Sequence, residues 1–196
     1  MITALITSII LGISGIVAVL FHYKAFAFQE PMPIEPLDTP ELPPNLPVEP
    51  VLPPKAPTML EQLYTLSKSL LGTHLGRDKS VPNMVNCANA CTDVLIRAGV
   101  KGLPPKGIAG TSALLSFLED SPEFQETKTY TPGAVIISAT GTGNGRARGH
   151  VGICGNNQIM SNNSETGLWE AQWDIKRWTD YYQVYGGIKT RFFIPK

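Results

Sequence analysis

Hydrophobic and polar positions change their spacing along the chain and divide it into three segments. Residues 2–21 contain no charged side chain, and a run of this length can cross a bilayer as a helix. Residues 31–57 contain eleven prolines, a density that prevents helix and sheet and favours an extended, polyproline-like strut. From Thr58 onward, apolar residues recur first at helical and then at strand spacing. We therefore predict a transmembrane anchor over 1–28, a proline-rich linker over 29–57 and one globular domain over 58–196.

The first part of the globular domain has the pattern of three helices. The stretch TMLE at 58–61 matches a capping box, and leucines at helical spacing follow it. A second helix is predicted from Cys87 to Ala98, because the next residue, Gly99, is of the type that most often ends a helix. A third, short helix follows Thr111. The helices thus precede any strand in the chain.

After Pro132 the spacing becomes that of strands separated by turns rich in glycine and asparagine. The predicted strands are residues 133–139, 150–154, 158–162 and 187–194. Between the last two lies an aromatic-rich segment, 169–185, which we expect to be partly helical. Helices followed by strands indicate an α+β fold, with the N-terminal helices packed on a C-terminal antiparallel β-sheet.

Charge narrows the classes of partner. The chain has no net formal charge and a pI of about 6.8, which argues against a nucleic-acid partner, since such proteins concentrate basic residues on one surface. Residues 58–196 alone carry fourteen basic and eleven acidic side chains. This small positive balance is compatible with an anionic partner and equally with ordinary solubility.

Three cysteines, Cys87, Cys91 and Cys154, are too few for a disulfide framework. Cβ atoms four residues apart on a helix are separated by about 5–6 Å, whereas a disulfide needs about 3.5–4.5 Å, so Cys87 and Cys91 are not expected to pair. A zinc site that adds His150 and Cys154 is not expected either, because four residues of strand separate these two by roughly 13 Å. Cys91 and Cys154 lie in apolar runs and are predicted to pack in the core.

Cys87 differs because it opens the predicted second helix, with Asn86 as its candidate N-cap. Unpaired N–H groups and the positive end of the helix dipole favour the thiolate, the form that a nucleophile needs. Such a cysteine needs a histidine base, and His150 begins a predicted strand directly after the glycine-rich turn GTGNGRARG. Three polar residues of the next strand are candidates to orient the imidazole: Ser161, Asn162 and Asn163. Strand alternation lets only some of them face it.

Four short motifs follow one another in the globular part. They are NCANACTDVLIRAG at 86–99, PGAVIIS at 132–138, GHVGI at 149–153 and MSNNSETGLW at 160–169. Together they resemble the papain-like cysteine peptidase/amidase superfamily of cell-wall hydrolases, in particular its CHAP and NlpC-type domains. The last motif is most similar to phage or phage-derived members. The resemblance covers about residues 58–196, the whole globular part.

The resemblance implies a papain-like α+β fold in which Cys87 is the nucleophile and His150 is the base. A CHAP-type alignment puts Asn162 in the orienting position, and an NlpC-type alignment puts Ser161 there. We choose Asn162, because an amide oxygen accepts a hydrogen bond from the imidazole N–H more definitely than a hydroxyl does. Neither a metal nor a cofactor is implied.

The implied activity is peptidoglycan hydrolysis through an acyl-enzyme. The bond cut is an amide of the wall peptide, so the activity is that of an endopeptidase or an N-acetylmuramoyl-L-alanine amidase. Combined with the predicted anchor, this implies a single-pass, membrane-anchored phage lysin, or a virion-associated one, whose catalytic domain faces the cell wall. The alternative is a catalytically inactive wall-binding or virion structural domain of the same fold.

Three further features of the sequence bear on this function. GTGNG at 141–145 leads into a strand and lacks the lysine of a phosphate-binding loop, so we interpret it as a turn at the active site. Arg146 and Arg148 could meet a carboxylate of a wall peptide. The aromatic side chains of 169–185 are expected to form either core or a binding groove.

Overall fold

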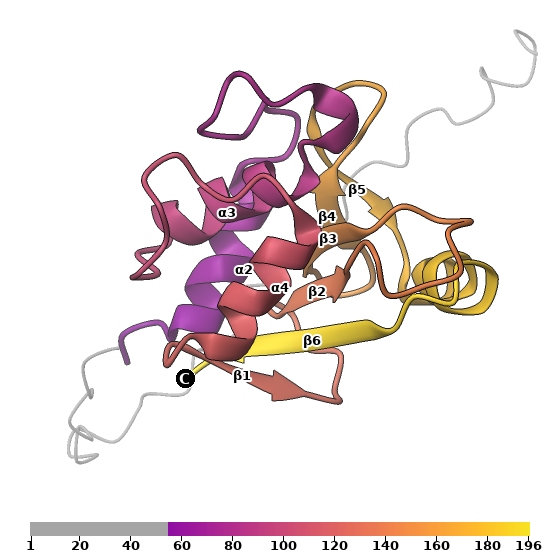
Figure 1. Cartoon of the computed structure of the whole chain (residues 1–196). Helices are drawn as coiled ribbons and strands as arrows, with labels where there is room; N and C mark the ends of the chain where they lie inside the picture. The colour runs from indigo at the N-terminus through magenta and orange to yellow at the C-terminus, as the bar shows by residue number, and fades with distance from the viewer. Residues whose placement is uncertain (1–54) are drawn as a thin grey trace, which may run out of the picture. The chain divides into compact units, whose positions relative to one another are not determined.

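Helices precede strands along the chain, as the hydrophobic pattern predicts. The computed structural model describes residues 55–196 (Figure 1). The α-helices α2 (Met59–Ser69), α3 (Cys87–Arg97) and α4 (Thr111–Asp120) lie where the sequence predicts three helices. The predicted anchor over 1–28 and the linker up to residue 54 lie outside the described residues. Within 55–196, no helix combines the length and apolar character needed to span a membrane.

Local chemistry sets the ends of the first two long helices. The Thr58 hydroxyl accepts a hydrogen bond from the Glu61 backbone N–H at 3.2 Å, and the Glu61 carboxylate accepts one from the Thr58 N–H at 2.7 Å. This reciprocal pair confirms the predicted capping box. α3 ends at Ala98, and Gly99 follows it at φ +91°, a left-handed conformation that favours glycine. The predicted end of this helix is therefore confirmed.

Six strands form one antiparallel sheet in the order β1-β6-β2-β3-β4-β5. They are β1 (Phe124–Thr127), β2 (Val135–Ser138), β3 (His150–Cys154), β4 (Ile159–Asn162), β5 (Trp169–Trp173) and β6 (Thr190–Pro195). Four of them confirm the predicted strands, whereas β1 and β5 were not predicted. The segment after β5 is helical in α5 (Ile175–Trp178) and in the π-helical turn η2 (Thr179–Tyr185), as expected for part of 169–185.

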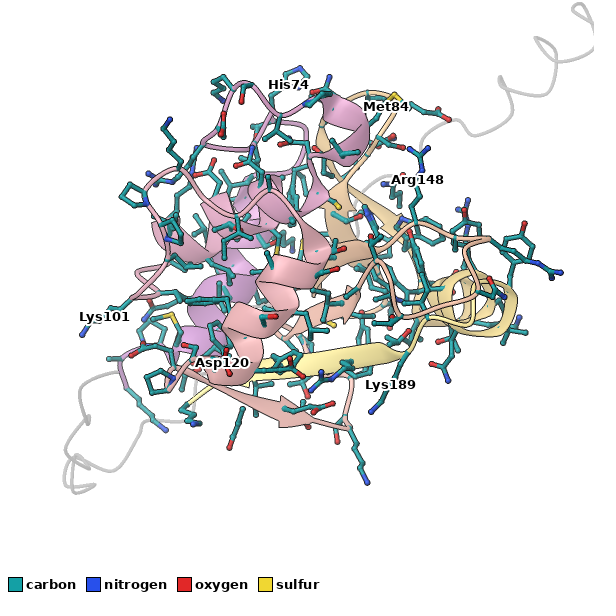
Figure 2. The ribbon with its side chains drawn as sticks, in the orientation of Figure 1. His74, Met84, Lys101, Asp120, Arg148 and Lys189 are labelled. Carbon is teal, nitrogen blue, oxygen red and sulfur yellow. The ribbon has the colours of Figure 1, made fainter. Side chains whose placement is uncertain are left out.

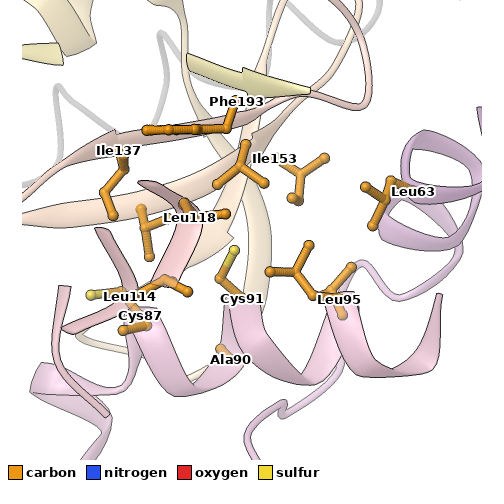
Figure 3. Packing of buried hydrophobic residues seen from close by; sticks show 14 of the residues in the cluster. Leu63, Cys87, Ala90, Cys91, Leu95, Leu114, Leu118, Ile137, Ile153 and Phe193 are labelled. Atoms are coloured by element: carbon orange, nitrogen blue, oxygen red, sulfur yellow. The ribbon is translucent and has the colours of Figure 1, made fainter. Parts of the chain in front are cut away.

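The two faces of the sheet bury different kinds of side chain, because successive residues of a strand point to opposite faces. On one face, here called the helix face, Ile137 and Ile153 pack against leucines of α2, α3 and α4 (Figure 3). On the other, here called the aromatic face, Ile136 packs in a smaller cluster with Trp178 and Tyr182. Figure 1 shows η2 in yellow beside the start of β6, away from α2 and α4.

Buried polar residues of α3 bind the loop that precedes the helix. Asn89 Oδ1 accepts hydrogen bonds from the backbone N–H groups of Arg77 at 3.0 Å and Asp78 at 3.2 Å. The Asp93 carboxylate is buried and accepts hydrogen bonds from the side chains of Arg77 and Arg97. A buried polar group is costly to leave unpaired, so these contacts fix the loop against the first turns of the helix.

Candidate active site

Cys87, the first residue of α3, is 9% exposed and lines an open groove. Burial raises the pKa of its thiol to about 11, although hydrogen bonds from the backbone N–H groups of Ala88 and Val151 to the sulfur act in the opposite direction. The expectation that the helix start favours a thiolate is therefore wrong for the resting protein. Loss of solvation raises the pKa by more than the N–H groups lower it, so Cys87 is a neutral thiol at pH 7.

Asn86 stands at the N-cap position of α3, but its side chain does not cap the helix. Its Nδ2 donates to the Leu75 carbonyl at 2.8 Å and to Asn162 Oδ1 at 3.3 Å, and its Oδ1 accepts from Asn89 Nδ2 at 2.7 Å. The predicted capping bond is thus replaced by tertiary ones. These bonds tie the residue before Cys87 to the preceding loop and to β4.

His150, the first residue of β3, lies against three aromatic rings. Its ring centroid is 5.4 Å from that of Trp178 and 5.9 Å from that of Tyr182, with interplanar angles of 30° and 18°, so both are stacked. Trp173 lies tilted at 6.2 Å. We call Trp173, Trp178 and Tyr182 the aromatic cover. Burial lowers the pKa of His150 to about 4, so the imidazole is neutral at pH 7.

The glycine-rich turn before His150 is fixed by close approach of the chain to itself. A Cβ on Gly149 would lie 2.2 Å from the Thr140 backbone nitrogen, so only glycine fits there. Thr140 Oγ1 accepts a hydrogen bond from the Gly149 N–H at 3.0 Å and shares one with Thr111 Oγ1 at 3.0 Å. The turn is thereby attached to the start of α4, and it delivers His150 to the first position of β3.

Cys87 and His150 approach the groove from opposite faces of the sheet. His150 pairs with Ser138, whose hydroxyl accepts a hydrogen bond from Trp178 Nε1 at 3.0 Å, which puts the imidazole on the aromatic face. Val151 packs on the helix face, and its backbone N–H points to the Cys87 sulfur. Both predicted residues therefore line one groove, each at the first position of its element.

The three candidate orienting residues have different surroundings. Asn162 accepts from Asn86, as described, and donates to the Asn83 carbonyl at 3.1 Å and that of Asn163 at 3.2 Å. Asn163 donates to Glu170 Oε2 at 2.8 Å from its position beside a turn. Among the hydrogen bonds of residues 55–196, none joins either asparagine to His150.

Ser161 is the candidate that shares the aromatic face with His150. It pairs with Gly152, so it lies diagonally across from His150 on neighbouring strands. Its hydroxyl is fully buried and has no hydrogen-bond partner within the described part of the chain. The same is true of Trp173 Nε1 in the aromatic cover. A buried hydroxyl without a partner is costly, so Ser161 has a free hydrogen-bonding group on the same face of the sheet as the imidazole.

The groove extends beyond these residues and has sides of different chemistry. Met84 and Val85 form an apolar side just before α3 and are 68% and 46% exposed. Arg146 and Arg148 line the groove from the glycine-rich turn and make no ion pair with a residue in 55–196. Figure 2 shows Met84 and Arg148 on the same side of the molecule. Another side is the exposed surface of α5 and η2, and the start of α4 lines the groove as well.

All three cysteines are free thiols, and Cys91 and Cys154 are fully buried in the helix-face and aromatic-face clusters, which confirms their predicted core packing. In the region the structure describes, no three His, Cys, Asp or Glu side chains lie close enough together to hold a metal ion.

The aromatic cover was not recognised in the sequence. The segment 169–185 was expected to be either core or groove, and it is both. Trp178 and Tyr182 are buried, whereas Tyr181 and Tyr185 are 42% and 50% exposed. Each pair is four residues apart, the helical spacing that puts side chains on one side of a helix. This spacing was the signal that could have separated the two roles.

Comparison with models of protein families, with curated proteins and with solved structures gives no match to this chain.

Proposed function

We propose that the chain is a peptidoglycan hydrolase of the papain-like superfamily, which cleaves an amide bond of the wall peptide with Cys87 as nucleophile and His150 as base. The observation that carries the proposal is that a thiol at a helix start and an imidazole at a strand start line one open groove. A cysteine nucleophile needs this pairing of a sulfur with a nearby base.

The resting charges define the first step of the mechanism. With a thiol pKa of about 11 and an imidazole pKa of about 4, both groups are neutral at pH 7. The sulfur of Cys87 therefore attacks the amide carbonyl while its proton passes to His150, instead of starting from an ion pair. The negative charge that develops on the carbonyl oxygen would be met by unpaired backbone N–H groups at the start of α3.

The second half of the reaction returns the enzyme to its starting state. His150 gives the proton to the leaving amine as the carbon–nitrogen bond breaks, which leaves a thioester on Cys87. A water molecule then attacks the thioester, with His150 as the base, and releases a carboxylic acid and the free thiol. The reaction consumes only the substrate amide and one water molecule, and both side chains return to their starting state.

Ser161 replaces Asn162 as our proposed orienting residue. Both the oxygen and the nitrogen of the Asn162 amide already form hydrogen bonds to residues just before α3. The Ser161 hydroxyl is buried, has no hydrogen-bond partner within residues 55–196, and lies on the same face of the sheet as the imidazole. A hydroxyl oxygen can accept a hydrogen bond from an imidazole N–H, directly or through a buried water. Asn162 becomes a structural residue in this proposal.

The anchor over 1–28 and the linker over 29–57 complete the proposal. They would hold the domain at a membrane and let it extend to the wall, either at the cell surface or on a phage particle. An inactive wall-binding domain is the second candidate, and the observation that favours it is the raised pKa of the Cys87 thiol. The two candidates differ in whether the thiol is needed.

Cell-wall clearing by the full chain tests the need for the thiol. Replacing Cys87→Ala removes the nucleophile, and the initial clearing rate of isolated walls should fall by roughly a thousandfold or more. Cys91→Ala is the matched control, since Cys91 lies one helical turn away and is fully buried in the core. Clearing by the Cys87 variant at the wild-type rate would rule out the mechanism. Binding of walls without clearing by the wild-type chain would establish the second candidate.

A further inference from the structure

The exposed side of η2 carries two tyrosines whose rings stack on each other. The ring centroids of Tyr181 and Tyr185 are 5.8 Å apart with an interplanar angle of 27°. Both side chains line the groove, and both are exposed, at 42% and 50%. Large aromatic side chains gathered on an exposed surface mark a binding site more often than isolated ones do.

Tyr181 packs against the aromatic cover, and Tyr185 is attached to the cover through its stacking on Tyr181. Tyr181 meets Tyr182 edge-on at 4.9 Å and 90°, and it lies tilted against Trp173 at 5.8 Å. The guanidinium of Arg177 lies over the Trp173 ring at 4.8 Å and also lines the groove. The Tyr181 ring is therefore fixed before any ligand arrives and gives Tyr185 a ring to stack on, which lowers the entropy cost of binding.

This combination fits a sugar ring. A pyranose has apolar C–H faces, which suit the electron-rich face of an aromatic ring, and hydroxyl edges, which need polar partners. Gln172, Asp174 and Arg177 line the groove near the tyrosines and offer donors and acceptors of this kind. An extended peptide would instead need unpaired backbone groups, which a helical turn such as η2 presents poorly.

We propose that Tyr181 and Tyr185 form a sugar-binding subsite that holds the glycan strand of the wall beside the reactive thiol. The inference rests on the proposed function and narrows it. Two ring contacts, of 5.9 Å and 4.9 Å, lead from His150 through Tyr182 to Tyr181. A sugar on the tyrosines thus lies at the His150 end of the groove and brings the amide nearest the glycan toward that base, whereas cross-link amides lie several residues farther along the peptide. The favoured bond is the one between N-acetylmuramic acid and L-alanine.

A binding measurement tests the subsite without any catalysis. The full chain carrying Cys87→Ala is titrated with glycan oligosaccharides freed of peptide, and the quenching of tryptophan fluorescence reports binding. Adding Tyr185→Ala should raise the Kd about tenfold, the loss of affinity expected for one aromatic contact. Tyr185→Trp should keep the binding. Val184→Ala is the matched control, because Val184 is 75% exposed on the same turn and does not line the groove.

Two results would overturn the subsite: no binding of oligosaccharide by the Cys87→Ala chain, or equal affinity with and without Tyr185. Tyr185 is preferred to Tyr181 for this test, since Tyr181 contacts Tyr182 and its removal could disturb His150. A folded Tyr185→Ala protein is verified by its unchanged melting temperature.

A pair of soluble substrates tests the choice of bond. One is a lactoyl-peptide, and the other carries the same scissile amide attached to the disaccharide of the wall. The wild-type chain should show a higher kcat/KM for the disaccharide substrate, and Tyr185→Ala should reduce that preference about tenfold. Mass spectrometry of digested walls should show free L-alanine amino termini. If only cross-link amides are cut, the sugar-binding subsite is overturned, whereas the proposed hydrolase function is retained. If the chain binds glycan but clears no wall, the hydrolase function is overturned and the subsite is retained.

Discussion

The two faces of the sheet each supply one half of the candidate site, and they hold it in different ways. On the helix face, Cys87 is positioned by α3. Buried hydrogen bonds of Asn86 and Asn89 hold the start of this helix to the preceding loop and to β4. On the aromatic face, His150 is held by ring stacking alone, without a side-chain hydrogen bond to any residue of 55–196. Cys87 is thus positioned by a network of hydrogen bonds, and His150 is positioned by the packing of aromatic rings.

The largest expected effect comes from removing the ring that stacks closest to His150. Trp178→Ala should lower the free energy of unfolding by about 3–5 kcal/mol, because it empties a fully buried site and leaves the Ser138 hydroxyl without its indole donor. It should also lower kcat, since Trp178 is the closest of the three rings that hold the imidazole and Tyr182 and Trp173 pack against Trp178 as well. Urea unfolding and wall clearing, both measured where the variant is still folded, test the two expectations.

Leu95→Ala is the control on the helix face. Leu95 is fully buried in the helix-face cluster, and its loss should cost about 2–5 kcal/mol by the same cavity mechanism. Because the network around Asn86 still fixes Cys87, the kcat of the folded fraction should stay near that of wild type. Equal losses of kcat in the two variants would contradict the distinction between the faces.

A smaller effect separates the adjacent residues Ser161 and Asn162, which point to opposite faces. Asn162→Ala should lower the free energy of unfolding by about 1–3 kcal/mol, because it removes one of the two acceptors of the buried Asn86 amide and leaves the Asn83 and Asn163 carbonyls without the Asn162 donor. Ser161→Ala should change stability little, since its hydroxyl has no partner to lose, but it should lower kcat by about tenfold to a hundredfold.

The pH profile of kcat/KM shows whether Ser161 or Asn162 orients the imidazole through a hydrogen bond or only contributes to packing. Loss of a hydrogen bond to His150 should move the acid limb of the profile in Ser161→Ala and leave it unchanged in Asn162→Ala. A shift in Asn162→Ala alone would restore Asn162 as the orienting residue, as the sequence motifs first indicated.

The sequence indicated which residues meet in the site more reliably than it indicated their chemical state. Cys87 and His150 could be predicted because each opens an element, and a helix start and a glycine-rich turn are visible locally. The choice between Ser161 and Asn162 depends on register: a motif gives a position along β4, but only the pairing of Ser161 with Gly152 says which face each residue occupies.

The thiolate expectation failed for a related reason. The helix start acts on Cys87 locally and is visible in the sequence, whereas burial depends on elements distant in the chain, such as β3 and β4. Desolvation is the larger influence on the pKa of Cys87, and it becomes known only with the packing. The stacking of Trp178 and Tyr182 on His150 is likewise a product of packing, although their spacing is regular.

Packing of His150 on the aromatic face should make the folded protein less stable in acid. Burial holds the pKa of His150 near 4 in the folded protein, whereas a histidine in an unfolded chain titrates near 6.5. Between these values the unfolded state binds more protons, so the free energy of unfolding should fall as the pH is lowered from about 6.5 to 4, by up to about 1.4 kcal/mol per unit. His150→Gln should remove this part of the slope, since the amide does not titrate. Urea unfolding of both proteins at pH 6.5 and 4.5 measures it, and parallel losses would show that the aromatic face does not exclude water from the imidazole.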